Sequence, residues 1–214
     1  MGKHQLCSDD GCRWRRRKEA RPGEILDAAL DLFTEKGFAA TKLTDVAARA
    51  GVSKGTVYLY FDSKEALFQE MVKETLLPHL EEAEIRVGGH EGSTADLMYG
   101  LCAHWRNNIL NSKAAGIPKL VIAESSNFPE MARFYMDNVV SRGTALVERI
   151  LQRGVDKGEF RPMDITHTAR AVLAPMIFAA IYDHSLRPHD KGPYDVEKYL
   201  DSHLQMILHG LKVA

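Results

Sequence analysis

This chain of 214 residues has few cysteines, no long uncharged stretch and almost no net charge. Each of these features excludes or disfavours a class of protein. The three cysteines, Cys7, Cys12 and Cys102, are an odd number, which favours a reducing compartment over a disulfide scaffold. The uncharged run at 171–182 has 12 residues, fewer than the ~20 that a membrane-spanning helix needs. The N-terminus has charges but no apolar stretch behind them, unlike a secretory signal. We therefore expect a soluble, cytoplasmic protein with no membrane partner.

The net charge of -1, from 28 basic and 29 acidic residues, argues by itself mildly against a nucleic-acid binder. The charge is unevenly distributed, however. Residues 1–64 hold 12 basic and 9 acidic groups, whereas the remainder holds 16 and 20. We expect residues 1–21 to form a flexible basic arm, able to lie along a minor groove or to contact phosphates.

Catalytic signatures are also missing. No serine occupies a nucleophile-elbow context, no glycine-rich phosphate loop occurs, and no pair of histidines flanks a glutamate on one helix face. His4, Cys7 and Cys12 can supply three zinc ligands, but their spacing is unlike a structural site and a fourth ligand is absent. We therefore expect no enzyme, no cofactor and no metal.

Almost every segment has the helical period, and no stretch alternates apolar and polar residues long enough to predict a strand. The sequence predicts an all-α protein of about nine helices. Three short helices within 22–70 precede a long fourth helix, which joins them to an α-helical domain at 71–214. There, helical patterns cover 94–111, 118–125, 129–157, 164–186 and 195–212, and their ends are marked by Pro129, Gly158, Asp164 and Asp195.

The segment from Leu43 to Tyr58 has the pattern of a helix-turn-helix. An apolar-faced helix ends at Gly51, a residue suited to the tight turn, and Ser53 can cap the next helix. With Val57 facing inward, the outward side of that helix carries unusually little charge. Such a face suits contact with base edges in the major groove better than contact with water.

The wider stretch 25–68 resembles the DNA-binding domain of the TetR family of transcriptional regulators. The resemblance is carried by 25–29, Leu32-Phe33, Gly37-Phe38, Ala40-Thr41, 45–47, 50–61 and 63–67. It implies a homodimer that binds a near-palindromic double-stranded DNA operator, usually as a repressor. It further implies release of the operator when a small molecule enters the C-terminal domain.

The resemblance also implies roles for individual residues. Thr41 and Thr44 frame the supporting helix, the next helix faces the groove, and Lys64 clamps a phosphate. Leu59 stands where many relatives carry histidine, so an apolar contact replaces a polar one. The DNA-binding candidates are Thr41, Thr44, Ser53, Lys54, Gly55, Thr56, Tyr58, Leu59 and Lys64.

The second half is richer in apolar residues than one inward helix face requires. The run 171–182 is apolar nearly all round, which indicates burial on two sides. The last helix has a similarly broad stripe: Val196, Tyr199, Leu200, Leu204, Ile207, Leu208 and Leu211. The resemblance implies that these two helices pair with their copies in a four-helix dimer interface. An internal core with an amphipathic lid is the alternative.

Aromatic, methionine and sparse polar side chains of this half are candidates for an effector pocket. They are His104, Trp105, Glu124, Phe128, Met131, Phe134, Tyr135, Met176, Phe178 and Tyr182. Each taken singly fits a plain core residue better than a ligand contact, and Glu124 can either pair with a cationic ligand or face solvent. Our hypothesis is a repressor released by a small lipophilic effector and controlling efflux or detoxification genes. The alternatives are an effector-independent DNA-binding regulator or an α-helical enzyme.

Overall fold

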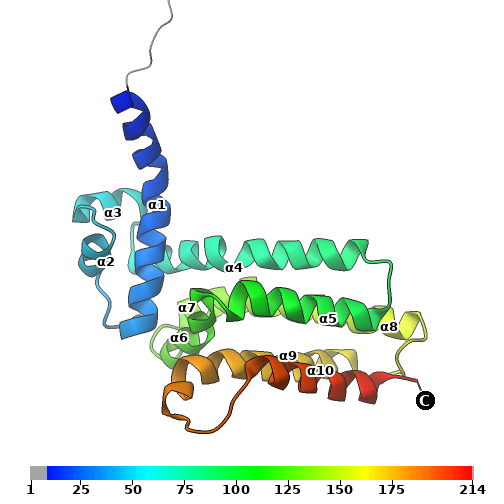
Figure 1. Ribbon diagram of the computed structural model, residues 1–214. Coiled ribbons are helices and arrows are strands. Elements are labelled where there is room, and N and C mark those ends of the chain that lie inside the picture. Colours follow the sequence, from blue (N-terminus) through cyan, green and yellow to red (C-terminus); the bar gives the residue numbers. More distant parts are fainter. Residues whose placement is uncertain (1–8, 214) are drawn as a thin grey trace, which may run out of the picture. The chain divides into compact units, whose positions relative to one another are not determined.

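The computed structural model describes the backbone of residues 9–213 and the side chains of residues 22–213. It divides into two compact units, Met1–Met71 and Val72–Ala214. The described part of both units is built from helices, so the all-α prediction is confirmed (Figure 1). Counted as continuous helical segments, the helices of residues 9–213 number nine, as the sequence predicts.

The first unit contains α1 (Asp9–Lys36), α2 (Leu43–Arg49), α3 (Lys54–Tyr60) and the start of α4 (Lys64–Gly89). The prediction of a flexible arm over residues 1–21 is wrong from Asp9 onward, because α1 already begins there. Residues 1–8 lie outside the described part. The first helix therefore begins upstream of residue 22, where the sequence predicted the helical domain to start, and Pro22 lies within α1.

An aromatic cluster forms the core of the first unit. The rings of Phe33, Phe38 and Phe68 are all buried, with centroids 5.1 to 6.4 Å apart in tilted and edge-on arrangements. Such geometries are favoured by the ring quadrupole, which adds to the gain from burying the apolar area. The core therefore joins the end of α1 to the start of α4.

Two glycines set the turns of this unit. Gly37 and Gly51 have φ values of 86° and 67°, in the left-handed region that side chains other than glycine rarely adopt. The predicted turn at Gly51 is confirmed by this geometry, and Gly37 makes the equivalent turn after α1. The cap predicted at Ser53 is also confirmed, because its hydroxyl oxygen accepts a hydrogen bond from the amide of Thr56 at 3.1 Å.

The second unit continues along α4 and adds six helices: α5 (Thr94–Trp105), α6 (Gly116–Glu124), α7 (Pro129–Tyr135), α8 (Ser141–Asp156), α9 (Ile165–Ser185) and α10 (Val196–Leu211). A π-helical turn at Arg106–Leu110 extends α5, and another at Met136–Val140 joins α7 to α8. The caps predicted at Asp164 and Asp195 are confirmed, since both carboxylates accept backbone hydrogen bonds.

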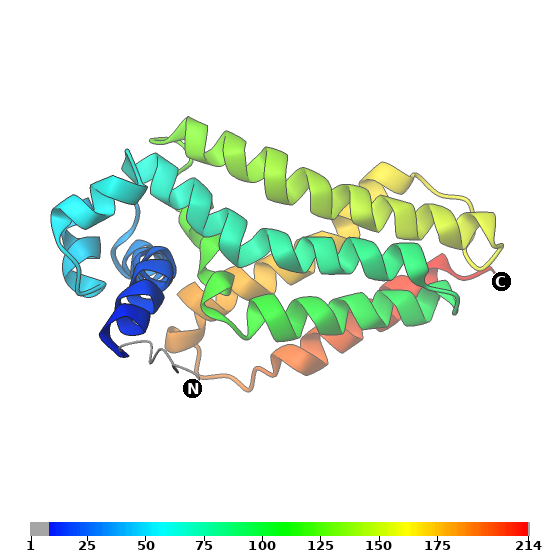
Figure 2. The same cartoon turned by 90° about the horizontal axis from the view of Figure 1, so that it is seen from above.

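The core of the second unit gathers buried side chains of α4, α5, α8, α9 and α10, where α9 packs against both α8 and α10 (Figure 2). Leu200, Leu204, Leu208 and Leu211 of α10 are buried in it. The other members of the predicted stripe, Val196, Tyr199 and Ile207, are partly buried against the same core. The stripe therefore does not remain free for a partner, because the chain's own core already covers it.

The outward side of α9 differs from its inward side. Length and composition alone would allow this helix to cross a membrane, but five of its residues lie in the protein core. Phe178 on α9 and Met206 on α10 remain 51% and 69% exposed. The apolar surface that α9 and α10 leave exposed is therefore narrower than the broad stripes that the sequence predicts for these helices.

Candidate DNA-binding and effector sites

The helix α3 presents its outward face as predicted. Val57 is fully buried, whereas Tyr58 and Leu59 are 46% and 75% exposed. Lys54 and Gly55 are exposed too, and the Lys54 ammonium lies 5.5 Å from the centre of the Tyr58 ring. Exposed apolar and aromatic groups on a short capped helix form a surface that suits base edges better than water.

Gly55 lies in the first turn of α3, where it has no side chain to project from the outward face. A Cβ atom added there would meet only the Ser53 hydroxyl at 3.7 Å, an ordinary contact. The fold of α3 therefore does not require a glycine at this position. Its absent side chain leaves room for a close approach of another molecule to the backbone.

Two more predicted residues support α3 or flank it. The Thr56 hydroxyl lies 2.8 Å from the Ser53 hydroxyl, so both groups belong to the cap at the start of the helix. Thr44 is exposed in the first turn of α2. Thr44 is thus available to a ligand, whereas Ser53 and Thr56 hold the first turn of α3.

Thr41 is not a surface residue, in contrast to its predicted place at the DNA interface. It is 2% exposed, and its hydroxyl shares its one proton between the carbonyl oxygens of Gly37 at 2.8 Å and Leu32 at 3.2 Å. These bonds tie the loop before α2 to the end of α1. Thr41 stabilises the DNA-binding unit from within, and its side chain does not reach the surface.

Lys64 also differs from its predicted role as a phosphate clamp. Its ammonium donates to the carbonyl oxygens of Phe38 at 2.6 Å, Ala39 at 3.2 Å and Thr41 at 3.1 Å. It also lies 4.5 Å from the centre of the Phe38 ring. An ammonium has three N–H donors, which is enough for one hydrogen bond to each of these carbonyls. Lys64 therefore stabilises the loop between α1 and α2.

Sequence reasoning missed an ionic contact that orients α2. The Arg49 guanidinium donates to both carboxylate oxygens of Glu35 on α1, at 3.1 and 2.8 Å, and lies 3.9 Å from Asp31. Hydrogen bonding to Glu35 raises the pKa of Arg49 above its ordinary value. Two parallel hydrogen bonds fix direction as well as distance. No local sequence pattern shows this pairing, because the partners are 14 residues apart on different helices.

The ten effector candidates occupy four regions of the second unit: α5, the end of α6, α7 with the residue before it, and α9. His104, Met131, Tyr135 and Met176 are buried. Trp105, Glu124, Phe128, Phe134 and Tyr182 are half-buried, and Phe178 is exposed. The structure packs α6 against both α7 and α9, which brings three of these regions into contact.

The two tyrosines among the effector candidates lie in different surroundings. Burial raises the pKa of Tyr135 to about 12, so its phenol stays neutral at physiological pH. Tyr182 donates a short hydrogen bond to Asp190, and its ring lies 4.7 Å from that of Tyr194. Tyr182 and Phe178 thus belong to an outer aromatic cluster that includes Tyr194, a residue that sequence reasoning did not single out.

An open hollow of about 290 Å³ lies near the end of α4 and the start of α5. It is lined by Arg86, Gly89, His90, Asp96, Leu97, Gly100 and Leu101. None of the ten effector candidates contributes to this hollow. It is therefore separate from the effector site predicted from the sequence.

Comparison with protein families agrees with this architecture. Residues 25–71 match the family described as bacterial regulatory proteins, tetR family, and residues 90–191 match a tetracyclin repressor-like C-terminal domain. The HTH-type transcriptional regulator YfiR of Bacillus subtilis is 30% identical over 148 residues, which are 68% of this chain and 71% of that protein.

Two further relatives span nearly the whole chain. The fatty acid metabolism regulator protein of Bacillus subtilis is 24% identical over 91% of this chain and 98% of its own. The crystal structure of NalD, the secondary repressor of the MexAB-OprM multidrug efflux pump in Pseudomonas aeruginosa, aligns with a TM-score of 0.73. It is 26% identical, over 91% of this chain and 98% of that one. The chain therefore belongs to the TetR family of DNA-binding transcriptional regulators.

Proposed function

We propose that this regulator is a homodimeric repressor that leaves its operator when a small lipophilic effector binds the second unit. The observation that carries the proposal is the outward face of α3, where Gly55, Tyr58 and Leu59 are exposed on a helix capped by Ser53. This surface is poor in charge, so binding depends on base contacts and on register more than on attraction to phosphate.

Binding in register with two successive major grooves requires two DNA-binding units. In B-DNA, equivalent positions on successive major grooves are about 34–36 Å apart, and a dimer reads two half-sites at that separation. The exposed Phe178 on α9 and Met206 on α10 support pairing through these helices. Because the α10 stripe is already covered, the proposed dimer uses the outer sides of α9 and α10 only.

The proposed effector is apolar. Met131, Tyr135 and Met176 are buried, and the half-buried Phe128 and Phe134 lie in the same part of the chain. A neutral phenol at Tyr135 offers a hydrogen bond without a charge. The names of the two relatives, a fatty acid metabolism regulator and a repressor of a multidrug efflux pump, support a lipophilic effector and control of efflux or detoxification genes.

Release follows from linkage between the two units. The helix α4 begins in the DNA-binding unit and ends in the effector unit, so the chain connects both through it. An effector shifts the equilibrium only by its difference in affinity for the two conformations. We propose that it binds more tightly to the conformation whose α3 helices no longer match successive grooves.

An effector-independent regulator is the second candidate. It is favoured by the absence of all ten effector candidates from the hollow beside α4 and α5. The two functions differ in one measurable property. Only the first predicts a compound that both stabilises the protein and weakens operator binding.

The experiment titrates labelled fragments from around the protein's own gene at several salt concentrations. A specific operator should bind with a Kd of about 10⁻⁸ M or tighter, and affinity should fall steeply as salt rises. Equal affinity for unrelated DNA would contradict the regulator proposal. A thermal-shift screen of lipophilic compounds then identifies effectors, which are tested for operator release.

A further inference from the structure

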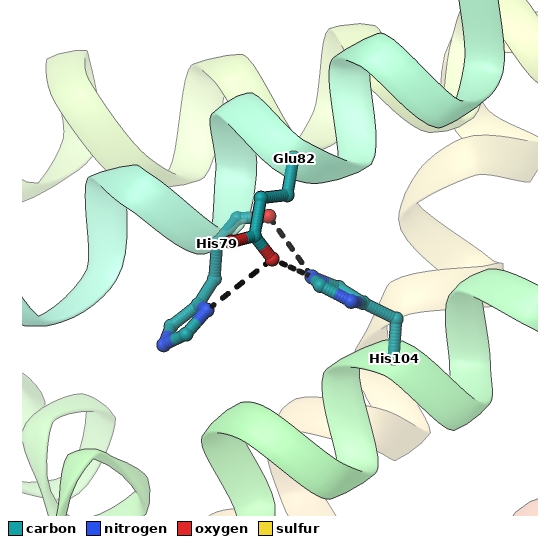
Figure 3. A group of neighbouring side chains, drawn as sticks. All are labelled: His79, Glu82 and His104. Atoms are coloured by element: carbon teal, nitrogen blue, oxygen red, sulfur yellow. Dashed lines mark hydrogen bonds and ion pairs between the residues drawn. The ribbon is translucent and has the colours of Figure 1, made fainter. Parts of the chain in front are cut away.

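Three potential metal ligands meet between α4 and α5. His79 and Glu82 lie three residues apart on α4, and His104 faces them from the last turns of α5 (Figure 3). One ligand atom from each residue lies within 4.8 Å of the others. Glu82 Oε2 is 3.9 Å from His79 Nδ1 and 3.8 Å from His104 Nε2.

The His104 imidazole is held in place, whereas the Glu82 carboxylate is not. The His104 side chain is only 7% exposed, and its Nε2 lies 3.1 Å from the carbonyl oxygen of His79. Its Nδ1 lies 3.1 Å from the side-chain amide of Asn108. The Glu82 side chain is 58% exposed and can therefore swing toward both rings.

One nitrogen of the cluster has no hydrogen-bond partner. His79 Nδ1 is buried and has no hydrogen-bond partner, although it faces Glu82. A buried polar atom without a partner is uncommon and costs free energy. A cation bound by this nitrogen and by the carboxylate would satisfy both groups.

The ligand set selects the class of cation. Two imidazole nitrogens and one carboxylate oxygen suit Zn²⁺ and its first-row neighbours, whereas Ca²⁺ and Mg²⁺ prefer oxygen ligands alone. Zinc lies about 2.0–2.2 Å from such ligands, which places tetrahedral ligand atoms about 3.3 Å apart. The observed distances of 3.8 and 3.9 Å from the carboxylate oxygen need a contraction of about half an ångström, which a swing of Glu82 can supply. The two imidazole nitrogens, which lie within 4.8 Å of each other, must also move closer, and a rotation of the His79 ring can supply this because its Nδ1 has no hydrogen bond to break.

We propose that His79, Glu82 and His104 bind a divalent first-row transition metal of the zinc class, with water at the remaining position. Metal binding at His104 Nε2 replaces the hydrogen bond between this nitrogen and the His79 carbonyl oxygen, and it moves the imidazole proton to Nδ1. The Asn108 amide keeps its hydrogen bond to the His104 carbonyl oxygen at 2.9 Å. The bound ion joins α4 to α5, and the site stands whether or not an effector releases the operator.

Cobalt tests the site because its visible absorption reports coordination. Full-length protein stripped with a chelator should bind one Co²⁺ per chain with a low-coordinate spectrum, and Zn²⁺ should displace it and raise Tm. Glu82→Gln and His79→Ala should each weaken binding by at least about 100-fold, because even losing an outer-shell partner costs about 10- to 100-fold. Both changed side chains are partly exposed, which limits the effect on folding.

His167 provides the matched control. Its Nδ1 lies 2.9 Å from Asp164, an exposed carboxylate–histidine pair at the same i, i+3 spacing but outside the cluster of three. His167→Ala should leave cobalt binding unchanged. Loss of the cobalt spectrum in this variant would contradict the assignment. So would unchanged affinity in Glu82→Gln, cobalt–thiolate absorption from cysteine ligands, or no stoichiometric binding by the unmodified protein.

Discussion

The ammonium nitrogen of Lys64 lies 2.6 Å from the carbonyl oxygen of Phe38, which precedes it by 26 residues. This contact joins the first turn of α4 to the loop that follows α1, and the same ammonium covers the Phe38 ring. A lysine implied by family resemblance to bind phosphate is therefore part of the internal structure of the DNA-binding unit. Lys54, by contrast, is exposed on α3.

The two lysines should respond differently to removal of their charge. Lys64→Met should destabilise the DNA-binding unit by about 1.5–3 kcal/mol, because carbonyls that accept from a charged donor lose their partner. Lys54→Met should change stability by less than about 0.5 kcal/mol, as is usual for surface positions. Lys54→Met should instead reduce the slope of log affinity against log salt by about one, the loss of one phosphate contact. Denaturant unfolding and operator titration measure the two effects, and a reversed pattern would refute the assignment.

Substitutions of Gly51 and Gly55, the two glycines on either side of Ser53, should affect stability and operator affinity differently. Gly55→Ala has room for its methyl group and gains helix propensity, so the protein should be as stable as before or more so. Its operator affinity should fall about tenfold, because overpacking a close contact costs about 1–3 kcal/mol.

Gly51→Ala is the matched control, since φ at this position is 67°. An added side chain there costs roughly 1–2 kcal/mol of backbone strain, which should lower the midpoint of unfolding. Once folded, this variant should bind the operator nearly as well as the unmodified protein. If Gly55→Ala bound DNA normally, the outward face of α3 would not be the contact surface.

A charge on the exposed side of α9 should break the proposed dimer. Phe178→Glu places a carboxylate in an apolar contact, where an unpaired charge is strongly unfavourable. Sedimentation at micromolar concentration should show a dimer for the unmodified protein and a monomer for the variant. Ile85→Glu, at a 75% exposed position of α4, is the control and should remain dimeric. A dimer that tolerates Phe178→Glu would place the interface elsewhere.

The ion pair between α4 and α8 should make stability depend on pH in acid. Arg142 donates to both carboxylate oxygens of Glu84, at 3.1 and 2.9 Å, and this hydrogen bonding lowers the pKa of Glu84 below its ordinary value of 4.5. A carboxyl with a lowered pKa in the folded protein contributes stability above the unfolded value. That contribution is lost as pH falls through the folded value.

Glu84→Gln should therefore cost about 0.2–1 kcal/mol at pH 7, a small value because both side chains are about one-third exposed. The difference between variant and unmodified protein should shrink as pH falls below 4.5. Urea unfolding at a series of pH values measures it. A difference that stayed constant down to pH 3 would show that the ion pair contributes nothing.

Local patterns predicted most of the fold. The turns at Gly37 and Gly51 and the caps at Ser53, Asp164 and Asp195 all depend on residues close in sequence, and the structure has each of them. The start of α1 was missed because the basic segment before residue 22 was taken as an arm, although the helix already begins at Asp9.

Contacts between distant residues could not be predicted in the same way. Lys64 bonds to a loop 23 to 26 residues earlier, and the α10 stripe is covered by helices whose packing no local pattern shows. The sequence pattern indicates only part of the cluster at Glu82. His79 and Glu82 have the spacing that places them on one helix face, but only the packing of α5 brings His104 to them.

In the proposed mechanism, an effector bound in the unit Val72–Ala214 weakens operator binding by the unit Met1–Met71. The most direct test measures operator Kd with and without a saturating compound from the thermal-shift screen, and effector Kd with and without operator. Coupling of about 5- to 150-fold is typical of allosteric proteins, and linkage requires the same factor in both directions. Our account predicts equal weakening in both titrations. A compound that binds the second unit stoichiometrically and leaves operator Kd unchanged would contradict it.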